Sequence, residues 1–185
     1  MSEHDRRRWN GRYADGGMAP VSEHSPRPPP VFAPFEQLFP TEGHALDLAC
    51  GRGRSAVWLA SRGMEVWGVD VSPVAIGLAR ELASRYGVAD RCRFEAVDLD
   101  DGLPEGPLVD LLLCHLFRDH RLDEAMIGRL APGGLLAVVV RSEVGAGPAP
   151  FHARPGELRD AFGGLDVLTE GEDEGMAWIL ARRSM

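Results

Sequence analysis

The chain has 185 residues, of which 44% are hydrophobic and 26% charged, and its 20 basic and 28 acidic residues give a net charge of −8. This length and composition are typical of one globular domain with one core. No apolar run approaches the roughly 20 residues that cross a bilayer, so we expect no membrane insertion. The acidic charge disfavours a nucleic-acid partner, because a phosphate backbone would be repelled.

The first thirteen residues include a basic cluster with no apolar segment behind it, which does not resemble a secretory signal, so we expect a cytoplasmic location. The three cysteines, Cys50, Cys92 and Cys114, are odd in number and lack metal-ligand spacing. We therefore expect reduced, buried thiols and neither a disulfide framework nor a metal site.

The chain divides into two regions that differ in composition and hydrophobic pattern. We expect a helix with a proline-rich cover over residues 1–43, and the main domain over residues 44–185. Residues 5–13 can form a short helix that carries Trp9 and Tyr13 on one face. Seven of the fourteen prolines fall in residues 20–40, where they exclude a continuous helix or an inner strand.

From His44 onward, short apolar runs alternate with segments of helical period, which is the βαβ pattern of a parallel sheet. The expected strands cover residues 45–49, 64–70, 92–99, 108–117 and 135–140. The expected helices cover residues 55–63, 74–87, 121–130 and 155–162, the third of them stopped by Pro132-Gly133-Gly134. Residues 165–183 read as a closing hairpin of two strands. The pattern predicts an α/β fold with a doubly wound sheet.

The turn after the first strand carries the most informative residues. Gly51 and Gly53 allow the backbone to approach a ligand, and the helix that follows offers unpaired amides to an anion. The second strand ends at Asp70, where a carboxylate can bind two ribose hydroxyls. A dinucleotide such as NAD and the sulfonium nucleoside S-adenosylmethionine both fit this arrangement. Asp47 favours the second, because a carboxylate there would hold an ammonium group and would repel a pyrophosphate.

Residues 47–80, DLACGRGRSAVWLASRGMEVWGVDVSPVAIGLAR, resemble the first two motifs of class I S-adenosylmethionine-dependent methyltransferases. Val97-Asp98-Leu99, the strand over residues 110–117 and the closing hairpin continue the resemblance in order. It implies a Rossmann-like, seven-stranded, mostly parallel sheet with an antiparallel C-terminal hairpin strand. The W-N-x-R-Y sequence over residues 9–13 and the Pro-Gly-Glu-Leu over residues 155–158 are similar to the small tellurite-resistance and thiopurine methyltransferase group.

The resemblance also implies roles for single residues toward S-adenosylmethionine and its product S-adenosylhomocysteine. The expected cofactor-binding residues are Asp47, Ala49, Gly51 and Gly53 at the methionine part, Asp70 at the ribose, Val71, Asp98 and Leu99 at the adenine, and the backbone of Cys114 near the ammonium. Trp9 and Tyr13 are expected to close the site. Ligand binding should then order residues 1 to about 40, with Phe32 and Phe35 docking on the filled site.

His115, at the end of the fourth strand, is the candidate catalytic base, because an ordinary imidazole pKa near 6.5 suits proton transfer at neutral pH. Strand alternation leaves a second possibility open, in which Cys114 faces the cofactor and His115 packs against a helix. His120 and His152 are expected in loops near the pocket. Arg141, Ser142 and Glu143 are expected to shape the acceptor site, because the carboxyl ends of parallel strands open onto a binding crevice.

The sequence therefore predicts a methyltransferase acting on a small-molecule acceptor with a thiol, hydroxyl or heterocyclic group, as a monomer or homodimer. A nucleic-acid or protein methyltransferase, and a non-enzymatic domain that binds S-adenosylmethionine, are the alternatives. Against a nucleic-acid methyltransferase, the fourth strand ends in Cys-His-Leu-Phe, where enzymes that methylate the amino nitrogen of a flipped base carry an Asn/Asp-Pro-Pro-Tyr-like motif. Asp47 disfavours a nicotinamide oxidoreductase.

Overall fold

The computed structural model describes residues 3–15 and 25–185, and it describes side chains from Arg6 to Ala14 and from Ser25 onward. Part of the segment expected to become ordered on ligand binding, residues 1–2 and 16–24, lies outside the described residues. Across the described ranges, no helix combines the length and the apolar character that crossing a membrane requires.

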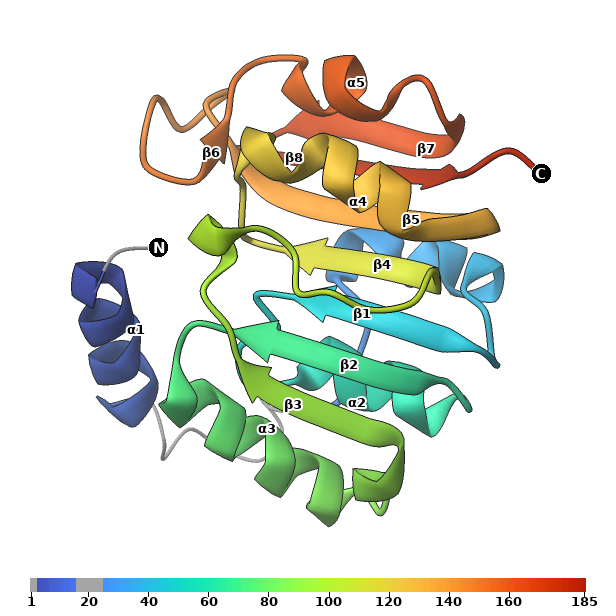
Figure 1. The fold of residues 1–185 in the computed structure, drawn as a ribbon. Helices are drawn as coiled ribbons and strands as arrows, with labels where there is room; N and C mark the ends of the chain where they lie inside the picture. Colours follow the sequence, from blue (N-terminus) through green and yellow to red (C-terminus); the bar gives the residue numbers. More distant parts are fainter. Residues whose placement is uncertain (1–2, 16–24) are drawn as a thin grey trace.

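One sheet runs through the molecule, with strand order β3-β2-β1-β4-β5-β8-β7 and a short β6 beside β5 (Figure 1). Strands β1, β2, β3, β4 and β5 are mutually parallel, whereas β8 runs antiparallel to both β5 and β7. The bounds are β1 His44–Leu48, β2 Glu65–Asp70, β3 Cys92–Ala96, β4 Val109–His115, β5 Leu130–Ser142, β6 His152–Ala153, β7 Asp166–Asp173 and β8 Met176–Arg182.

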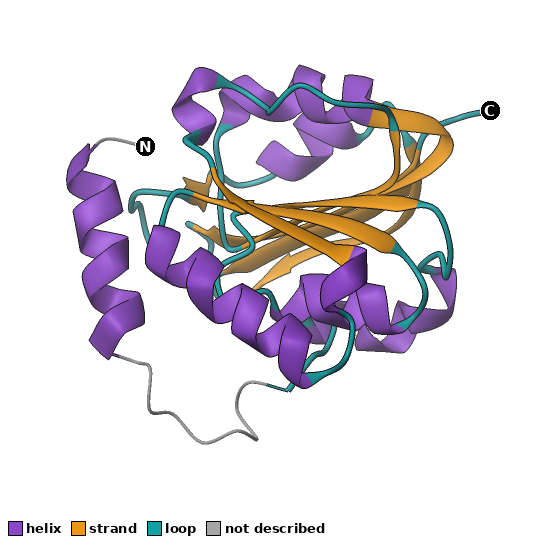
Figure 2. Cartoon of the chain, turned by 60° about the horizontal axis from the view of Figure 1, so that its bottom comes forward, coloured by secondary structure: helices purple, strands orange, loops and turns teal. Residues whose placement is uncertain are grey.

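Helices cover both faces of this sheet (Figure 2). Helices α2 (Arg54–Ser61) and α3 (Pro73–Arg85) enclose one half of the core, and α4 (Asp123–Arg129) and α5 (Glu157–Phe162) enclose the other. Side chains alternate across each strand, so β4 sends Leu111 and Leu113 to the α2 side and Leu112 to the α4 side. Burial on both faces explains why β4 reads as a nearly unbroken apolar run.

The observed topology confirms the predicted doubly wound fold and the antiparallel closing strand, and it corrects three local predictions. Strand β6 is an additional two-residue strand that pairs with Arg141 and Ser142 of β5. Helix α4 ends at Arg129, short of the predicted glycine stop. The Pro-Gly-Gly sequence instead lies within β5, where the pairing with β4 shifts register between Val109 and Leu111.

The third correction concerns the proline-rich segment, where Phe32 and Phe35 were expected to dock on the filled cofactor site. Residues Pro30–Leu38 form 3-10 turns, labelled η2, which bend at Phe35, directly after Pro34. Phe32 is fully buried, and Phe39 packs edge-on against Trp58 of α2 at 5.3 Å between ring centroids. Phe32 and Phe35 therefore belong to the core on the α2 side and do not dock on the cofactor site.

Helix α1 (Glu3–Asp15) stands beside the edge of the sheet where the parallel strands end (Figure 1). It contacts the start of α3, where the Ser72 hydroxyl donates a 2.5 Å hydrogen bond to the Asn10 side chain. Ser72 also caps α3 by accepting a 3.2 Å hydrogen bond from the Ala75 amide, with Pro73 in the first helical position. The capping residue of α3 thus also attaches α1.

Candidate functional site

The turn after β1 and the end of β2 are joined by a buried carboxylate. Asp70 accepts 2.9 Å hydrogen bonds from the amides of Gly51 and Ser72, one on each oxygen. The pKa of Asp70 is raised by burial and lowered by these two amides, with burial the larger effect. A carboxylate oxygen can accept a second hydrogen bond, so Asp70 keeps capacity for ligand hydroxyls.

Gly51 and Gly53 are each required in the turn, but for different structural reasons. Gly51 has φ +53°, and a Cβ there would lie 2.8 Å from the hydroxyl of Tyr13. Gly53 has φ +73°, and a Cβ there would lie 2.8 Å from the Cβ of Ala79 in α3. Gly51 therefore leaves room at the cavity, whereas Gly53 permits close helix packing, a different reason from the ligand approach that we expected for both.

Asp47 is the most unusual group in this region. Its side chain is 1% exposed, and its Oδ2 atom is buried without a hydrogen-bond partner among the described residues. Burial and the nearby Asp70 carboxylate raise the pKa of Asp47 to about 8, although a hydrogen bond from the Ala56 amide lowers it. A buried carboxylate oxygen without a partner costs free energy, so a cation bound here would supply a missing interaction.

A cavity of about 540 Å³ opens between these carboxylates and α1, within the range of small-molecule sites. It is lined by predicted site residues from five segments: Trp9, Tyr13, Asp47, Ala49, Gly51, Asp70, Val71 and His115. Ala49, Leu116 and Phe151 also line it and have left-handed backbones, with φ of 51°, 62° and 64°. Such strained non-glycine residues concentrate at functional sites.

Helix α1 contributes aromatic and basic side chains to the cavity. Trp9 and Tyr13 stack at 5.9 Å between ring centroids, as their spacing predicts. Arg52, in the glycine turn, donates a 3.2 Å hydrogen bond to the Tyr13 carbonyl, and the Arg12 guanidinium lies 5.3 Å from the Trp9 ring centroid. Burial and the Asp70 carboxylate raise the pKa of the Tyr13 phenol, so this hydroxyl stays protonated. Both aromatic side chains thus lie at the cavity.

His115 lines the cavity, while Cys114 points to the opposite face of the sheet. The Cys114 thiol is buried and donates a 3.2 Å hydrogen bond to the Phe117 carbonyl. Burial, with Arg54 and Arg27 nearby, lowers the pKa of His115 to about 4. This corrects the expectation of an ordinary imidazole, because His115 is neutral throughout the physiological range and is a weak base.

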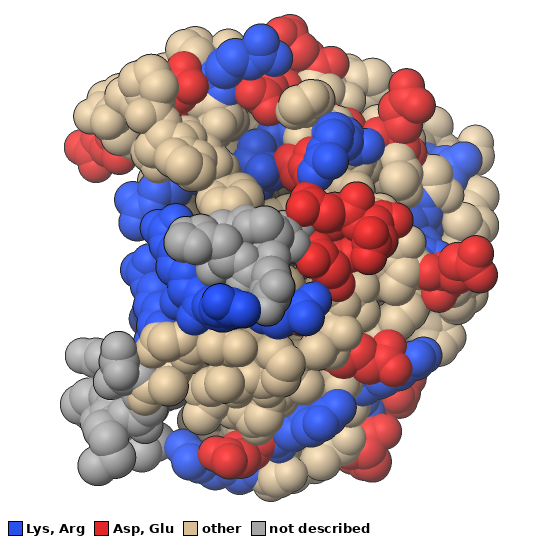
Figure 3. All heavy atoms as spheres, turned by 60° about the vertical axis from the view of Figure 1, so that its left-hand side comes forward, with Lys and Arg blue, Asp and Glu red and all other residues tan. Residues whose placement is uncertain are grey.

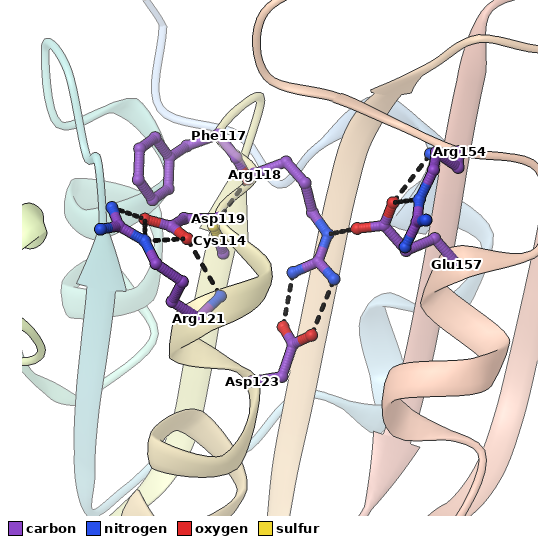
Figure 4. A network of polar contacts seen from close by, with 8 residues as sticks. All are labelled: Cys114, Phe117, Arg118, Asp119, Arg121, Asp123, Arg154 and Glu157. Carbon is purple, nitrogen blue, oxygen red and sulfur yellow. Dashed lines mark hydrogen bonds and ion pairs between the residues drawn. The ribbon is translucent and has the colours of Figure 1, made fainter.

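The loop after β4 is fixed by ion pairs from Arg118 to helices α4 and α5 (Figure 4). Arg118 is 8% exposed; its guanidinium binds Asp123 of α4 through two hydrogen bonds and donates another, of 2.7 Å, to Glu157 of α5. Glu157 also accepts a 2.9 Å hydrogen bond from the Arg154 amide. This network holds the segment that carries Leu116 and Phe117 into the cavity wall.

Four predicted cofactor-binding residues do not line the cavity: Gly53, Asp98, Leu99 and Cys114. Asp98 follows β3 and caps the short turn η4 (Leu99–Asp101) by accepting a 3.0 Å hydrogen bond from the Asp100 amide. Leu99 is 1% exposed and packs in the core on the α4 side. The adenine roles of Asp98 and Leu99 stay predictions.

Sequence reasoning missed several cavity residues. Arg8, Arg12, Arg52 and Arg54 were not assigned a role, and Phe151 reaches the cavity because β6 anchors the loop that carries it. No sequence motif marks these residues, although four of them are arginines in a strongly acidic chain. Of the residues expected at the acceptor side, Arg141 and His152 line the cavity.

Residues 45–134 match the family described as "Methyltransferase domain". Over this segment, the chain is similar to methyltransferase domains. The match contains β1, β2, β3 and β4 together with the glycine turn and Asp70, which lie at the site described above. These residues are the part of the chain that the sequence predicts to bind S-adenosylmethionine.

Among curated relatives, the chain is 27% identical over 145 residues to 2-heptyl-1-hydroxyquinolin-4(1H)-one methyltransferase of Mycobacteroides abscessus, covering 72% of this chain and 63% of the relative. It is 33% identical over 138 residues to ribosomal RNA small subunit methyltransferase C of Alcanivorax borkumensis, covering 69% of this chain and 39% of the relative. The chain thus spans less than two thirds of the length of each of these two relatives.

Among solved structures, TehB from Haemophilus influenzae superposes with a TM-score of 0.73 at 18% identity, covering 83% of this chain and 62% of TehB. At that identity, the likeness concerns the fold. It confirms the arrangement of a mostly parallel sheet with antiparallel C-terminal strands.

Proposed function

We propose that the protein transfers the methyl group of S-adenosylmethionine to a small-molecule acceptor. The observation that carries this proposal is the buried Oδ2 atom of Asp47, which lacks a partner within the described part of the chain and lies in a cavity beside Asp70. An amino-acid end supplies an ammonium group for Asp47, and a ribose supplies hydroxyls for Asp70. The pyrophosphate of a dinucleotide would instead meet the Asp47 carboxylate.

The bound cofactor supplies an electrophilic methyl group. The protein's own residues position the cofactor and the acceptor and exclude water from the cavity. Asp47 and Asp70 hold the two ends of the nucleoside, with Ala49 and Gly51 between them. Trp9 and Tyr13 exclude water from the α1 side of the cavity. A neutral His115 accepts a hydrogen bond from the acceptor, while its low pKa makes it a weak proton acceptor.

A small acceptor fits the remaining space, because α1 and the loop carrying Phe151 cover the cavity. The hydroxyquinolone methyltransferase of M. abscessus is a relative whose name specifies such an acceptor. Within the class, we place the chain with the small tellurite-resistance and thiopurine methyltransferase group, on the W-N-x-R-Y sequence that carries Trp9 and Tyr13 to the site. The cytoplasmic location and the monomeric or homodimeric state stay predictions.

A product screen tests the proposal. The protein is incubated with S-adenosylmethionine and panels of thiols, phenols, heterocyclic hydroxyls and inorganic chalcogens, and methylated products are identified by mass spectrometry. We expect product from at least one small-molecule panel, and much less product from the Asp70→Ala variant at a limiting S-adenosylmethionine concentration. Binding of S-adenosylhomocysteine without any product would favour the non-enzymatic alternative.

Ribosomal RNA is the alternative acceptor that one comparison favours, since a relative carries that activity in its name. The same assay with purified ribosomal RNA distinguishes the two. Transfer to RNA with no transfer to any small molecule would replace the proposed acceptor class and leave the cofactor assignment unchanged.

A further inference from the structure

The charge of the cavity is opposite to the charge of the chain. The chain carries −8, yet the cavity lining contains five arginines and two carboxylates: Arg8, Arg12, Arg52, Arg54 and Arg141 with Asp47 and Asp70. Figure 3 shows basic side chains gathered in a band on the side of the molecule that α1 occupies. Because an arginine guanidinium remains charged at any physiological pH, these side chains give the cavity a positive electrostatic potential that does not depend on pH in this range.

Strand register separates the two ends of the cavity. Asp47 of β1 lies opposite Leu113 of β4, and His115, two residues further along, lies opposite Val139 of β5. Arg141 is two residues beyond Val139 and pairs with His152 of β6. Alternation puts Asp47, His115 and Arg141 on the same face of the sheet, in that order across the strands. Both carboxylates are at the β1–β2 end, and Arg141 is at the other.

A cofactor carboxylate accounts for only part of this positive charge. One amino-acid end carries one carboxylate, and two arginines already lie at the α1 side of the cavity, Arg12 against the Trp9 ring and Arg52 at the Tyr13 carbonyl. Arg141 lies across the cavity on β5, and its side chain forms no hydrogen bond or ion pair with the described side chains, which run from Arg6 to Ala14 and from Ser25 onward. Arg54 and Arg27 act on His115, between the two ends, and contribute to its lowered pKa. The acceptor end is therefore positive as well.

The walls at this end are apolar. Phe117 and Phe151 lie 5.8 Å apart between ring centroids, and Leu116 and Pro150 complete the lining. We propose, on the basis of the function proposed above, that the acceptor is a small amphipathic anion, with an apolar ring-sized body against Phe151 and a carboxylate or phosphate bound by Arg141. A charge-assisted, bidentate pair of this kind gives arginine its preference for planar oxyanions.

Pairs of compounds that differ only in charge test this inference. Hydroxybenzoates and mercaptobenzoates are compared with the corresponding benzamides, and hydroxyphenyl phosphates form a third arm that separates phosphate from carboxylate. For each compound, kcat/KM is measured with S-adenosylmethionine, and binding of benzoate, benzamide and phenyl phosphate to the S-adenosylhomocysteine-loaded protein is measured by NMR titration. Arg141→Gln is the test variant, and Arg85→Gln, at the exposed far end of α3, is the control with the same change in charge.

We expect the anionic member to be favoured by at least about tenfold, in binding and in turnover, and Arg141→Gln to remove most of that preference. Arg85→Gln should leave it unchanged. Equal binding of benzoate, phenyl phosphate and benzamide, or a preference that survives Arg141→Gln, would overturn the inference even if no compound is methylated. Failure of the proposed function is a separate result, because it appears as absence of S-adenosylhomocysteine binding or of transfer to any acceptor.

Discussion

Replacing Asp47 by asparagine should stabilise the ligand-free protein at neutral pH and weaken its binding of S-adenosylhomocysteine. The Asp47 carboxyl is 1% exposed, and its pKa is raised from 3.8 to about 8, mainly by burial. A raised carboxyl pKa opposes folding above pH 4, because the unfolded chain is ionised while the folded chain must hold a proton or bury a charge. This cost grows from pH 4 to pH 8 and is constant above that.

The magnitude follows from the pKa difference. Each pH unit between 3.8 and the pH of measurement costs about 1.4 kcal/mol, so the cost at pH 7 is about 4 kcal/mol. The asparagine amide is itself buried, and its desolvation reduces the gain in unfolding free energy by about 1–3 kcal/mol. We therefore expect Asp47→Asn to gain about 1–3 kcal/mol of unfolding free energy at pH 7, or roughly 5 °C in Tm, and to lose its advantage as the pH falls to 4.

Thermal unfolding of both proteins between pH 4 and pH 8 measures this effect, with the exposed Asp160→Asn as the control for loss of one carboxylate. The reasoning is refuted if the Tm difference between Asp47→Asn and the wild type is negative at pH 7, or if it does not change with pH. On the ligand side, pairing an ammonium with Asp47 requires its ionised form. Binding at pH 7 should therefore release up to about 0.9 proton, seen by calorimetry in two buffers of different ionisation enthalpy, and Asp47→Asn should release none.

Three further predictions concern the same site. Asp70→Ala should weaken S-adenosylhomocysteine binding at least tenfold in calorimetry, since it removes a charged acceptor, and an unchanged Kd would place the ribose elsewhere. Arg118→Met should lower the unfolding free energy in urea by about 3–5 kcal/mol, because Asp123 would keep a buried charge without its partner and Glu157 would keep only Arg154. A loss below about 1 kcal/mol would show that the network contributes little. Hydrogen exchange of residues 3–15 should slow when S-adenosylhomocysteine binds, whereas equal exchange would mean that α1 is not part of the site.

Much of the fold follows from the sequence because local signals agree with the topology. Alternating apolar runs and helix-period segments predicted β1, β2, β3, β4 and β5 in order, and the Ser72-Pro73 start of α3 is a local capping signal. Strand β6 escaped prediction because two residues carry no period. The burial of Phe32 was not predicted because it depends on tertiary packing against Phe39, which in turn packs against Trp58 of α2.

The site divides in the same way. The glycine turn and Asp70 are close in sequence to the strands that position them, so their meeting is predictable from the βαβ unit. The properties that decide the chemistry depend on distant groups. The lowered pKa of His115 comes from burial and from Arg54 and Arg27, and the raised pKa of Asp47 comes from burial beside Asp70. The net charge likewise did not predict a positive cavity, because it is a sum over all residues and does not say where the arginines lie in the fold.

Calorimetric titration of the protein with S-adenosylhomocysteine and, separately, with NAD tests the assignment of the cofactor most directly. Asp47, the glycine turn and Asp70 predict saturable one-to-one binding of S-adenosylhomocysteine and no detectable binding of NAD. Tighter binding of NAD, or binding of neither compound, would contradict the account.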